Sequence, residues 1–427
     1  MEMRAPRGVR DILPEESWKW AYILNVLRDT MNDFGHSEVH LPIFEHTELF
    51  ARGVGDTTDI VEKEMYTFTD RGGRSITLRP EATASIVRLC IEHNLAGNGA
   101  PLKVWTAGPM FRYERPQKGR FRQFWQIDAE CLGVPSPIAD ADIIALSIEC
   151  FRRLGLRNLE VVMNSVGCPA CRPAYREKLI EYFESNKAQL CELCLSRMER
   201  NPLRLLDCKN EMCSTITDGA PSSIENLCVE CSEHFASTIK LLEASNITYK
   251  IDKKLVRGLD YYTKTAYEIL SGELGSQNAV CGGGRYDNLS ETIGGPRLHG
   301  VGFAAGIERI ALVMEQQACS FGEEPKPKVY VISLDDGDAT VRSTVYNLTM
   351  ALRKNYIAAE MDLIGRSFKA QMKSADSCGA RFACIIGPEE AKANNVSVKD
   401  LATGKQELIK EDSLINYLKT YLKKNAE

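Results

Sequence analysis

The stretch from residue 108 to residue 130 constrains the fold most, because cations alternate there with aromatic residues inside two apparent strands. Residues 104–107 and 121–127 are rich in β-branched and aromatic side chains, which are typical of strands. Residues 114–119 between them contain a proline and a glycine, which favour a loop. The sequence therefore predicts a β-hairpin with a long basic loop, and its five cations are Arg112, Arg115, Lys118, Arg120 and Arg122.

Arginines carried on such strands suit a ligand with phosphate groups. The planar guanidinium bonds two oxygens at once, and a rigid strand fixes its direction. A solvated run of charges is the alternative, but the mixing of charges with aromatic residues inside strands argues against it. We therefore expect a phosphate-binding site on the hairpin, with the loop cations meeting a second polyanion nearby.

Length and composition limit the organisation and the partners of the chain. Its 427 residues predict two or three domains, and 44% hydrophobic with 26% charged residues is ordinary for a soluble globular protein. No run of eighteen apolar residues occurs and the first residues lack an apolar signal core, so we expect no membrane span and a cytoplasmic location. The net charge of −5 excludes broad, nonspecific polyanion binding but allows local basic surfaces.

Cysteines crowd into residues 167–250, where three Cys-x-x-Cys pairs occur. In a large chain without a secretory signal, reduced thiols or a metal site are expected instead of disulfides. Nineteen residues separate the first two pairs, a spacing that fits one structural zinc site of four thiolates. Its ligands would be Cys168, Cys171, Cys191 and Cys194. A cysteine-rich helical insertion with reduced thiols is the alternative.

Polar residues outside the arginine cluster are candidates for a second part of the site. Glu81 and Thr83 lie at the start of an expected helix, which Thr83 is placed to cap. Gln126 and Glu130 stand four residues apart in a strand and therefore share one face. A buried glutamate requires a cation or a hydrogen-bond donor, and either a ligand or a nearby arginine would satisfy Glu130.

Three motifs resemble those of one enzyme family. FRYERPQKGRFRQF at 111–124 is similar to motif 2 of class II aminoacyl-tRNA synthetases in its histidyl form. LVRGLDYYTKTAYEI at 255–269 resembles the histidine-specific signature of histidyl-tRNA synthetases, and GVGFAAGIERIAL at 300–312 resembles motif 3. A helix, Gly35 and a strand over 38–44 interrupted by Pro42 resemble motif 1, which builds the dimer interface. The matches follow the family's order along essentially all 427 residues.

The resemblance implies roles for individual residues. Arg257 and Arg112 would be catalytic, with Arg257 bridging the histidine carboxylate and the α-phosphate of ATP. Arg112, Arg257 and Arg309 would bind ATP. The tRNA acceptor end would meet Arg115, Gln117 and Arg120. Histidine would bind at Glu81, Thr83, Gln126, Glu130, Tyr261 and Tyr262, while Trp125, where the family commonly has histidine, would face away from the pocket.

The same resemblance and the changes in composition predict an α+β fold in five segments. Residues 1–166 and 251–320 would form two parts of a catalytic domain, a largely antiparallel mixed sheet flanked by helices. The cysteine-rich helical insertion would occupy 167–250, and a polar linker 321–327. Strands alternating with helices over 328–427 predict an α/β anticodon-binding domain with a mostly parallel sheet.

The implied activity is the ATP-dependent ligation of L-histidine to tRNA(His) through a histidyl-adenylate, with release of AMP and pyrophosphate. The implied assembly is a homodimer that uses Mg²⁺ with ATP. One alternative is the catalytically silent regulatory subunit of histidine biosynthesis, which generally lacks the C-terminal domain and carries a degraded LVRGLDYY motif. Another is a zinc-dependent nucleic-acid-binding protein, which leaves residues 255–312 unexplained.

Overall fold

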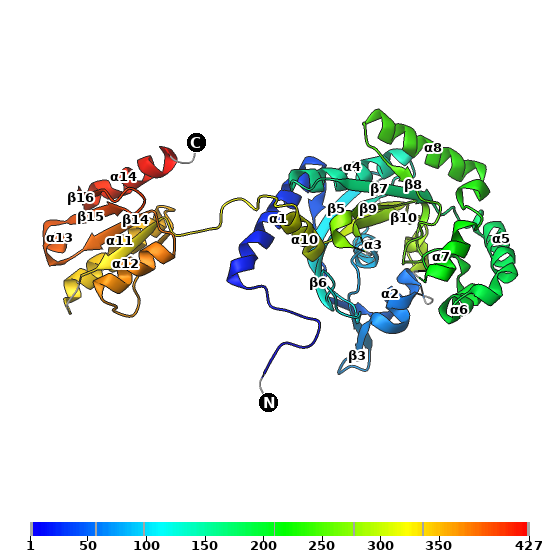
Figure 1. The fold of residues 1–427 in the computed structure, drawn as a ribbon, viewed down its shortest axis with the longest axis horizontal. Coiled ribbons are helices and arrows are strands. Elements are labelled where there is room, and N and C mark those ends of the chain that lie inside the picture. The colour runs from blue at the N-terminus through cyan, green and yellow to red at the C-terminus, as the bar shows by residue number, and fades with distance from the viewer. Residues whose placement is uncertain are drawn as a thin grey trace. The chain divides into compact units, whose positions relative to one another are not determined.

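A computed structural model describes residues 3–55, 58–96, 99–208, 210–275, 278–334 and 337–424. The chain divides into two compact units, with the boundary between Gly322 and Glu323 (Figure 1). In the described part of the chain, no helix combines the length and the apolar character that a membrane crossing requires.

An eight-stranded sheet organises the first unit, and five of its seven strand pairings are antiparallel. This confirms the expected largely antiparallel, mixed sheet. In spatial order its strands are β1 (Ser37–Glu38), β5 (Leu102–Phe111), β6 (Gln123–Leu132), β11 (Gly300–Gly306), β10 (Ala279–Arg285), β9 (Thr263–Ser271), β7 (Leu159–Ser165) and β8 (Lys250–Ile251).

The central hairpin consists of β5 and β6, which pair from Leu102 opposite Leu132 to Phe111 opposite Gln123. The predicted hairpin and its basic loop are therefore confirmed, with strands longer than the aromatic segments alone indicated. The strand expected over 38–44 is not continuous. Residues 39–43 separate β1 from β2 (Phe44–His46), because proline interrupts ladder hydrogen bonding. The residues from 255 to 262 form a loop before β9.

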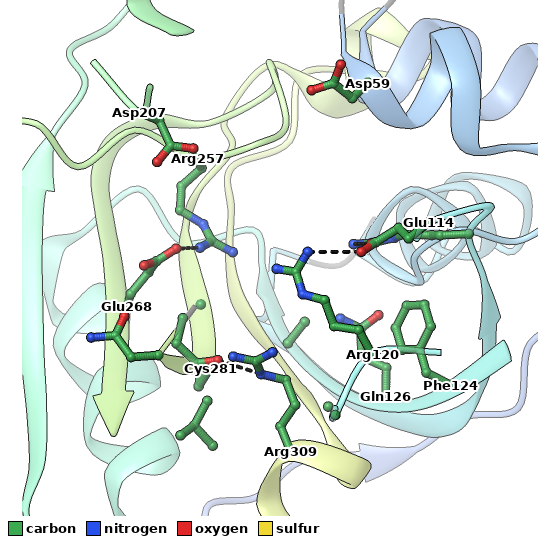
Figure 2. A pocket seen from close by; sticks show the side chains of 18 of the residues that line it. Asp59, Glu114, Arg120, Phe124, Gln126, Asp207, Arg257, Glu268, Cys281 and Arg309 are labelled. Atoms are coloured by element: carbon green, nitrogen blue, oxygen red, sulfur yellow. Dashed lines mark hydrogen bonds and ion pairs between the residues drawn. The ribbon is translucent and has the colours of Figure 1, made fainter. Parts of the chain in front are cut away.

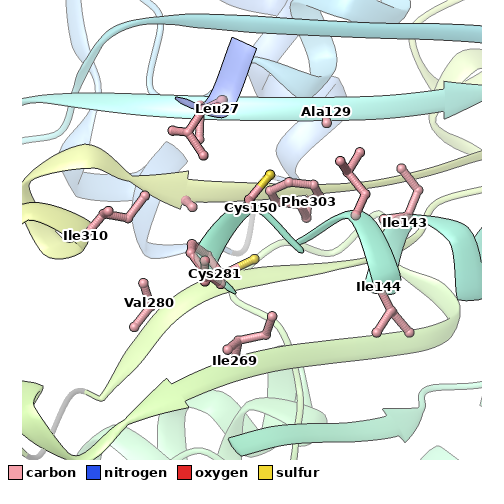
Figure 3. Packing of buried hydrophobic residues seen from close by; sticks show 14 of the residues in the cluster. Leu27, Ala129, Ile143, Ile144, Cys150, Ile269, Val280, Cys281, Phe303 and Ile310 are labelled. Atoms are coloured by element: carbon pink, nitrogen blue, oxygen red, sulfur yellow. The ribbon is translucent and has the colours of Figure 1, made fainter. Parts of the chain in front are cut away.

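One face of this sheet is covered by α1 (Pro14–Asp33), α4 (Pro137–Arg153) and α10 (Ile307–Gln316). Their apolar side chains form the main core with the inward residues of β6, β11, β10 and β9 (Figure 3). Ala129, Phe303 and Ile269 belong to this core, so the alternate residues of the same strands point to the opposite face. That opposite face is the one left to build a site.

The opposite face carries α3 (Thr83–Glu92) and a second, smaller sheet. The smaller sheet contains β2, β4 (Ser75–Leu78) and β3 (Tyr66–Thr69), and β3 and β4 pair as an antiparallel hairpin. The helices α2 (Thr47–Val54) and α9 (Leu289–Thr292) and the π-helical turn η1 (Ile60–Glu64) complete this layer.

Helices fill the chain between β7 and β8, as expected for the insertion. They have their own apolar core, which includes Tyr175, Leu179 and Phe183, and α8 packs against α4. In chain order the elements are α5 (Arg172–Ser185), η2 (Lys187–Gln189), α6 (Glu192–Arg200), η3 (Pro202–Leu205), α7 (Glu211–Asp218), η4 (Ile224–Asn226) and α8 (Val229–Ala244).

The second unit is an α/β domain around a five-stranded sheet in the order β13-β12-β14-β15-β16. The two pairings around β12 are parallel and the other two are antiparallel, so the prediction of a mostly parallel sheet is wrong for its second half. Strand β15 was not predicted, because its mostly polar sequence NVSVKD obscures the alternation of polar and apolar residues that is typical of a strand. The elements are β12 (Val329–Ser333), α11 (Ala339–Lys354), β13 (Ala359–Met361), α12 (Phe368–Ser377), β14 (Phe382–Ile386), α13 (Pro388–Ala393), β15 (Asn395–Asp400), β16 (Gln406–Lys410) and α14 (Glu411–Lys424).

Candidate active site

A cavity of about 680 Å³ lies over the face of the large sheet that is turned away from the main core. That volume is typical of sites for nucleotide-sized ligands. Its walls come from β6, β10 and β11, the loop of the central hairpin, the start of α10 and the insertion. Five arginines line it, and Figure 2 shows three of them, Arg120, Arg257 and Arg309, converging on the open space. The lining arginines are Arg112, Arg120, Arg197, Arg257 and Arg309.

Arg257 is held from three sides. Its guanidinium forms an ion pair with Glu268 of β9 and lies 5.7 Å from the ring centre of Tyr262. On the third side it lies against Gly282 of β10, where a Cβ atom would overlap it. Burial lowers the pKa of Arg257, but the Glu268 carboxylate outweighs burial and leaves the pKa above its ordinary value. The guanidinium is therefore a fixed positive charge.

Arg112 and Arg309 are fixed by backbone carbonyls. Arg112 Nε donates to the carbonyl oxygen of Pro80 at 2.8 Å, and its guanidinium lies over the ring of Phe124. Arg309 Nε donates to the carbonyl oxygen of Ala279 at 2.8 Å, and burial lowers the pKa of Arg309 to about 10. Both side chains line the cavity, where a guanidinium suits the recognition of phosphate.

The three residues expected to meet the acceptor end of a tRNA, Arg115, Gln117 and Arg120, lie in different places on the basic loop. Arg120 lines the cavity and its Nη1 lies 2.9 Å from Glu114 Oε2. Arg115 and Gln117 are exposed on the loop. Residues Gln117 and Arg120 bond each other through both backbone amides, which closes a tight turn at the tip. The loop thus presents cations both to the cavity and to its rim.

Beside the cavity, a group of buried carboxylates surrounds the start of α3. Glu81 accepts hydrogen bonds from the amides of Thr83 at 2.8 Å and Ala84 at 3.0 Å. The predicted Thr83 cap is therefore wrong, since Glu81 occupies the helix start and the Thr83 hydroxyl donates to Glu130 at 2.7 Å. Burial raises the pKa of Glu81, against the effect of its two amide donors.

Glu130 is bonded on both oxygens. Thr83 donates to Oε1, and the Tyr286 hydroxyl donates to Oε2. Burial raises the pKa of Glu130 to about 8, although both hydroxyl donors oppose this. The hydroxyl of Tyr261 lies 3.5 Å from Glu81 Oε2, and the ring of Tyr261 packs against those of Tyr262 and Tyr286. Five of the six residues expected to bind histidine thus lie together in one buried cluster, namely Glu81, Thr83, Glu130, Tyr261 and Tyr262.

Gln126 connects this buried pocket with the cavity, which it lines. Its Oε1 and both carboxylate oxygens of Asp128 are buried without a hydrogen-bond partner among the described residues. Burial, and then the nearby Glu130 and Glu81, raise the pKa of Asp128 well above its ordinary value. Trp125 on the opposite face of β6 packs edge-on against Trp20 of α1. The oxygens of Gln126 and Asp128 that lack a partner among the described residues could therefore form hydrogen bonds with a polar ligand.

Sequence reasoning missed three residues of the site. Asp128 stands between Gln126 and Glu130 and shares their strand face, so the same spacing rule would have found it. Tyr286 follows the glycine-rich segment over 281–284, whose role as strand β10 was not recognised. Glu268 lies opposite Gly282 in the β9–β10 ladder, a pairing that no sequence signal gives.

The cysteines of the insertion form two groups, each with four sulfur atoms within 4.8 Å of one another. Cys168 and Cys171 meet Cys228 and Cys231, while Cys191 and Cys194 meet Cys208 and Cys213. The predicted single site of Cys168, Cys171, Cys191 and Cys194 is therefore wrong. Spacing along the chain does not fix which pairs meet, and here the segments before α5 and α8 come together.

Comparisons with known proteins agree with these features. A family model described as histidyl-tRNA synthetase matches residues 8–310, and one described as an anticodon binding domain matches residues 328–421. A protein of Pelotomaculum thermopropionicum named histidine–tRNA ligase is 50% identical over 97% of each chain. One of the same name from Acetivibrio thermocellus is 48% identical over 98% of this chain and all of its own.

A solved structure extends the likeness to the fold. Apo histidyl-tRNA synthetase from S. aureus is 39% identical, covers 98% of this chain and 100% of its own, and gives a TM-score of 0.83. Likeness in sequence and in fold thus runs through both compact units. On this evidence the chain belongs to the histidyl-tRNA synthetase family of class II aminoacyl-tRNA synthetases.

Proposed function

We propose that this chain ligates L-histidine to tRNA(His) with ATP, through a histidyl-adenylate, and releases AMP and pyrophosphate. The observation that carries the proposal is the junction of two subsites at Gln126. On one side lies an arginine-lined cavity, and on the other a buried pocket of carboxylates and tyrosines. The first suits a nucleoside triphosphate, and the second suits a small zwitterion with a polar ring.

In the first step, the histidine carboxylate attacks the α-phosphorus of ATP. Arg257 and Arg112 lie on the cavity wall, where they stabilise charge on the histidine carboxylate and the α-phosphate, and Arg309 contacts the nucleotide. No side chain acts as nucleophile, so the rate enhancement comes from position and fixed charge. Arg257 suits this role because Glu268, Tyr262 and Gly282 hold it before the ligand arrives.

The histidine ammonium is received by Glu81 and Thr83 and the imidazole by Glu130, with Tyr261 and Tyr262 forming the aromatic wall. A neutral imidazole has one donor and one acceptor nitrogen, and a carboxylate with a facing hydroxyl reads both. An apolar amino acid would leave Gln126 Oε1, which is buried without a hydrogen-bond partner among the described residues, still unpaired, and this costs far more than a lost contact. We add Asp128 to this subsite, because its buried oxygens have no other partner among the described residues.

Mg²⁺ is the cofactor that we propose with ATP. Glu114 and Glu268 place carboxylates on the cavity wall, and Mg²⁺ typically takes one or two carboxylate ligands together with substrate phosphates. When bound, the ion would neutralise charge on the outer phosphates. In the second step the terminal ribose of the tRNA attacks the adenylate, and Arg120 at the cavity, with Arg115 and Gln117 on the exposed loop, meets the acceptor end.

We further propose the separate roles of the five segments that the motifs imply. Residues 1–166 and 251–320 catalyse both steps, the insertion over 167–250 contacts the acceptor arm, 321–327 links the units and 328–427 reads the anticodon. A homodimer in the cytoplasm completes the proposal. The dimer is supported by Ile43, Phe44 and Phe68, apolar side chains that lie exposed near the motif 1 segment and are suited to burial by a partner. Sedimentation at micromolar concentration would test it.

The decisive experiment is ATP–pyrophosphate exchange with each of the twenty amino acids supplied singly. Exchange with histidine alone is expected. Arg257→Ala should lower the rate by about 10²–10³-fold, the usual cost of one fixed donor to developing charge, while histidine binding persists. Absence of exchange with every amino acid, in folded protein that still binds histidine, would favour the regulatory-subunit reading instead.

A further inference from the structure

We propose that the insertion holds two structural zinc ions, each bound by four thiolates. The first site, here called the base site, consists of Cys168, Cys171, Cys228 and Cys231. The second, the wall site, consists of Cys191, Cys194, Cys208 and Cys213. This inference does not depend on the ligase activity, because it rests only on the arrangement of the sulfur atoms.

The distances between sulfur atoms match metal coordination. Zinc–sulfur bonds of about 2.3 Å in a tetrahedron separate the sulfurs by about 3.8 Å. Cys168 Sγ lies 3.7 Å from Cys171 Sγ and 3.9 Å from Cys228 Sγ, and Cys191 Sγ lies 3.9 Å from Cys208 Sγ. A disulfide would require a separation of about 2.05 Å. Both groups therefore have the spacing of a thiolate cage and not that of a covalent bridge.

The surroundings of the sulfurs also suit thiolates. The amide of Cys228 donates to Cys171 Sγ at 3.1 Å, and the amide of Cys191 donates to Cys213 Sγ at 3.3 Å. Such N–H donors stabilise sulfur charge around a bound metal. Arg172 follows directly on Cys171, so a positively charged residue stands next to the base site in the chain.

The donor set selects the metal and its role. Four soft thiolates favour zinc over Mg²⁺ or Ca²⁺, which take oxygen ligands. Four protein ligands fill a tetrahedron and leave no position for a substrate, so the ions are structural. Each site also joins segments far apart in the chain, since Cys228 lies 57 positions after Cys171. An ion there would stabilise a helical insertion that otherwise depends on its own small core.

The two sites would support different parts of the active site. Beside the base site, Arg172 donates to the backbone carbonyl of Tyr262, one of the tyrosines of the histidine pocket. The wall site lies at the cavity itself, which Cys191 and Cys208 line. Its helix α6 carries Arg197, whose Nη2 lies 3.1 Å from Asp59 Oδ2 across the cavity mouth. Zinc would thus fix both the histidine pocket and the position of the cavity wall.

Metal analysis of the full chain, purified without a polyhistidine tag under reducing conditions, tests the proposal. We expect two zinc ions per chain. Cys231→Ser should remove the base ion alone and Cys213→Ser the wall ion alone, leaving one per chain in each variant. Cys319→Ser, which changes a half-buried cysteine outside both groups, should keep two.

A second set of measurements, made on the unaltered protein, tests the proposal even if the cysteine variants do not fold. Titration of the unaltered protein with a mercurial should release two zinc ions per chain, and cobalt substitution should give the visible absorption of tetrahedral thiolate sites. Folded protein without zinc, or with disulfides among these eight cysteines, would overturn the proposal. Loss of all zinc from each of the two variants would overturn the two separate sites, and iron in place of zinc would overturn the choice of metal.

Discussion

The absence of a side chain at Gly282 should be what allows Arg257, the proposed catalytic arginine, to take its position. The Cα of Gly282 faces the guanidinium of Arg257, and a methyl group at this position would lie about 1 Å closer to Nη1, Nη2 and Cζ than the 3.4 Å at which ordinary contact begins. The guanidinium is the mobile end of a side chain, so Gly282→Ala should fold but displace Arg257 by about 1 Å. Misplacement of a catalytic group by that distance costs about 10²-fold in rate, or about 2.7 kcal/mol of barrier.

The assay is histidine-dependent ATP–pyrophosphate exchange, with histidine affinity and urea unfolding measured on the same samples. Gly282→Ala should lower kcat about 10²-fold, approach but not exceed the loss in Arg257→Ala, and leave the unfolding midpoint close to that of the unaltered chain. Gly272→Ala is the matched control, because a Cβ there meets no atom within 4 Å. A Gly282→Ala enzyme within twofold of the original kcat would refute the reasoning.

Three further predictions concern binding and stability. Burial raises the pKa of Glu130 to about 8, so histidine binding that needs the ionised carboxylate should release a proton near pH 7, and histidine affinity should rise with pH up to about 8. Calorimetry in two buffers should detect this proton release, and the Glu130→Gln variant should show none on binding histidine. Arg309→Ala should raise the KM for ATP about 10–10²-fold, the value of one charged hydrogen bond, with the KM for histidine unchanged in steady-state exchange. Arg285→Met should cost about 3–5 kcal/mol in urea unfolding, because it removes the guanidinium that pairs with the fully buried carboxylate of Asp140, 3.0 Å from Arg285 Nε, and leaves His234 Nε2, 3.2 Å from Asp140 Oδ2, as its remaining partner among the described side chains. Exposed Arg152→Met should cost under about 0.5 kcal/mol, and equal losses in the two variants would contradict this argument.

The parts of the fold that local chemistry determines could be predicted from the sequence. The hairpin of β5 and β6 followed from alternating aromatic and charged residues around a loop with proline and glycine, and the large sheet is largely antiparallel as expected. The helix expected before Gly35 is present as α1, which ends at Asp33, and the helix expected near Glu81 and Thr83 is present as α3. Short-range periodicity decides these elements, so one sequence was sufficient.

Long-range pairing could not be predicted in the same way. The cysteine spacing allowed several pairings of the Cys-x-x-Cys segments, and only the packing of α5 against the chain that leads to α8 brings Cys171 to Cys228. The ion pair of Arg257 and Glu268 likewise depends on the β9–β10 register, which places Glu268 opposite Gly282. The sequence therefore identified individual site residues while leaving their partners undetermined.

The glycines of β10 and β11 show how one sheet can hold a hydrophobic core and a charged site at once. On the core face, Phe303 and Cys281 pack beneath the helices. On the other face, Gly302 and Gly282 lack the side chains that would otherwise occupy the space of Glu130 and Arg257. A glycine inside a strand weakens it, and commonly marks a place where another group must approach the backbone closely. In this sheet that group is a charged side chain of the site itself, so the glycines that look like turn signals in the sequence are structural parts of the candidate active site.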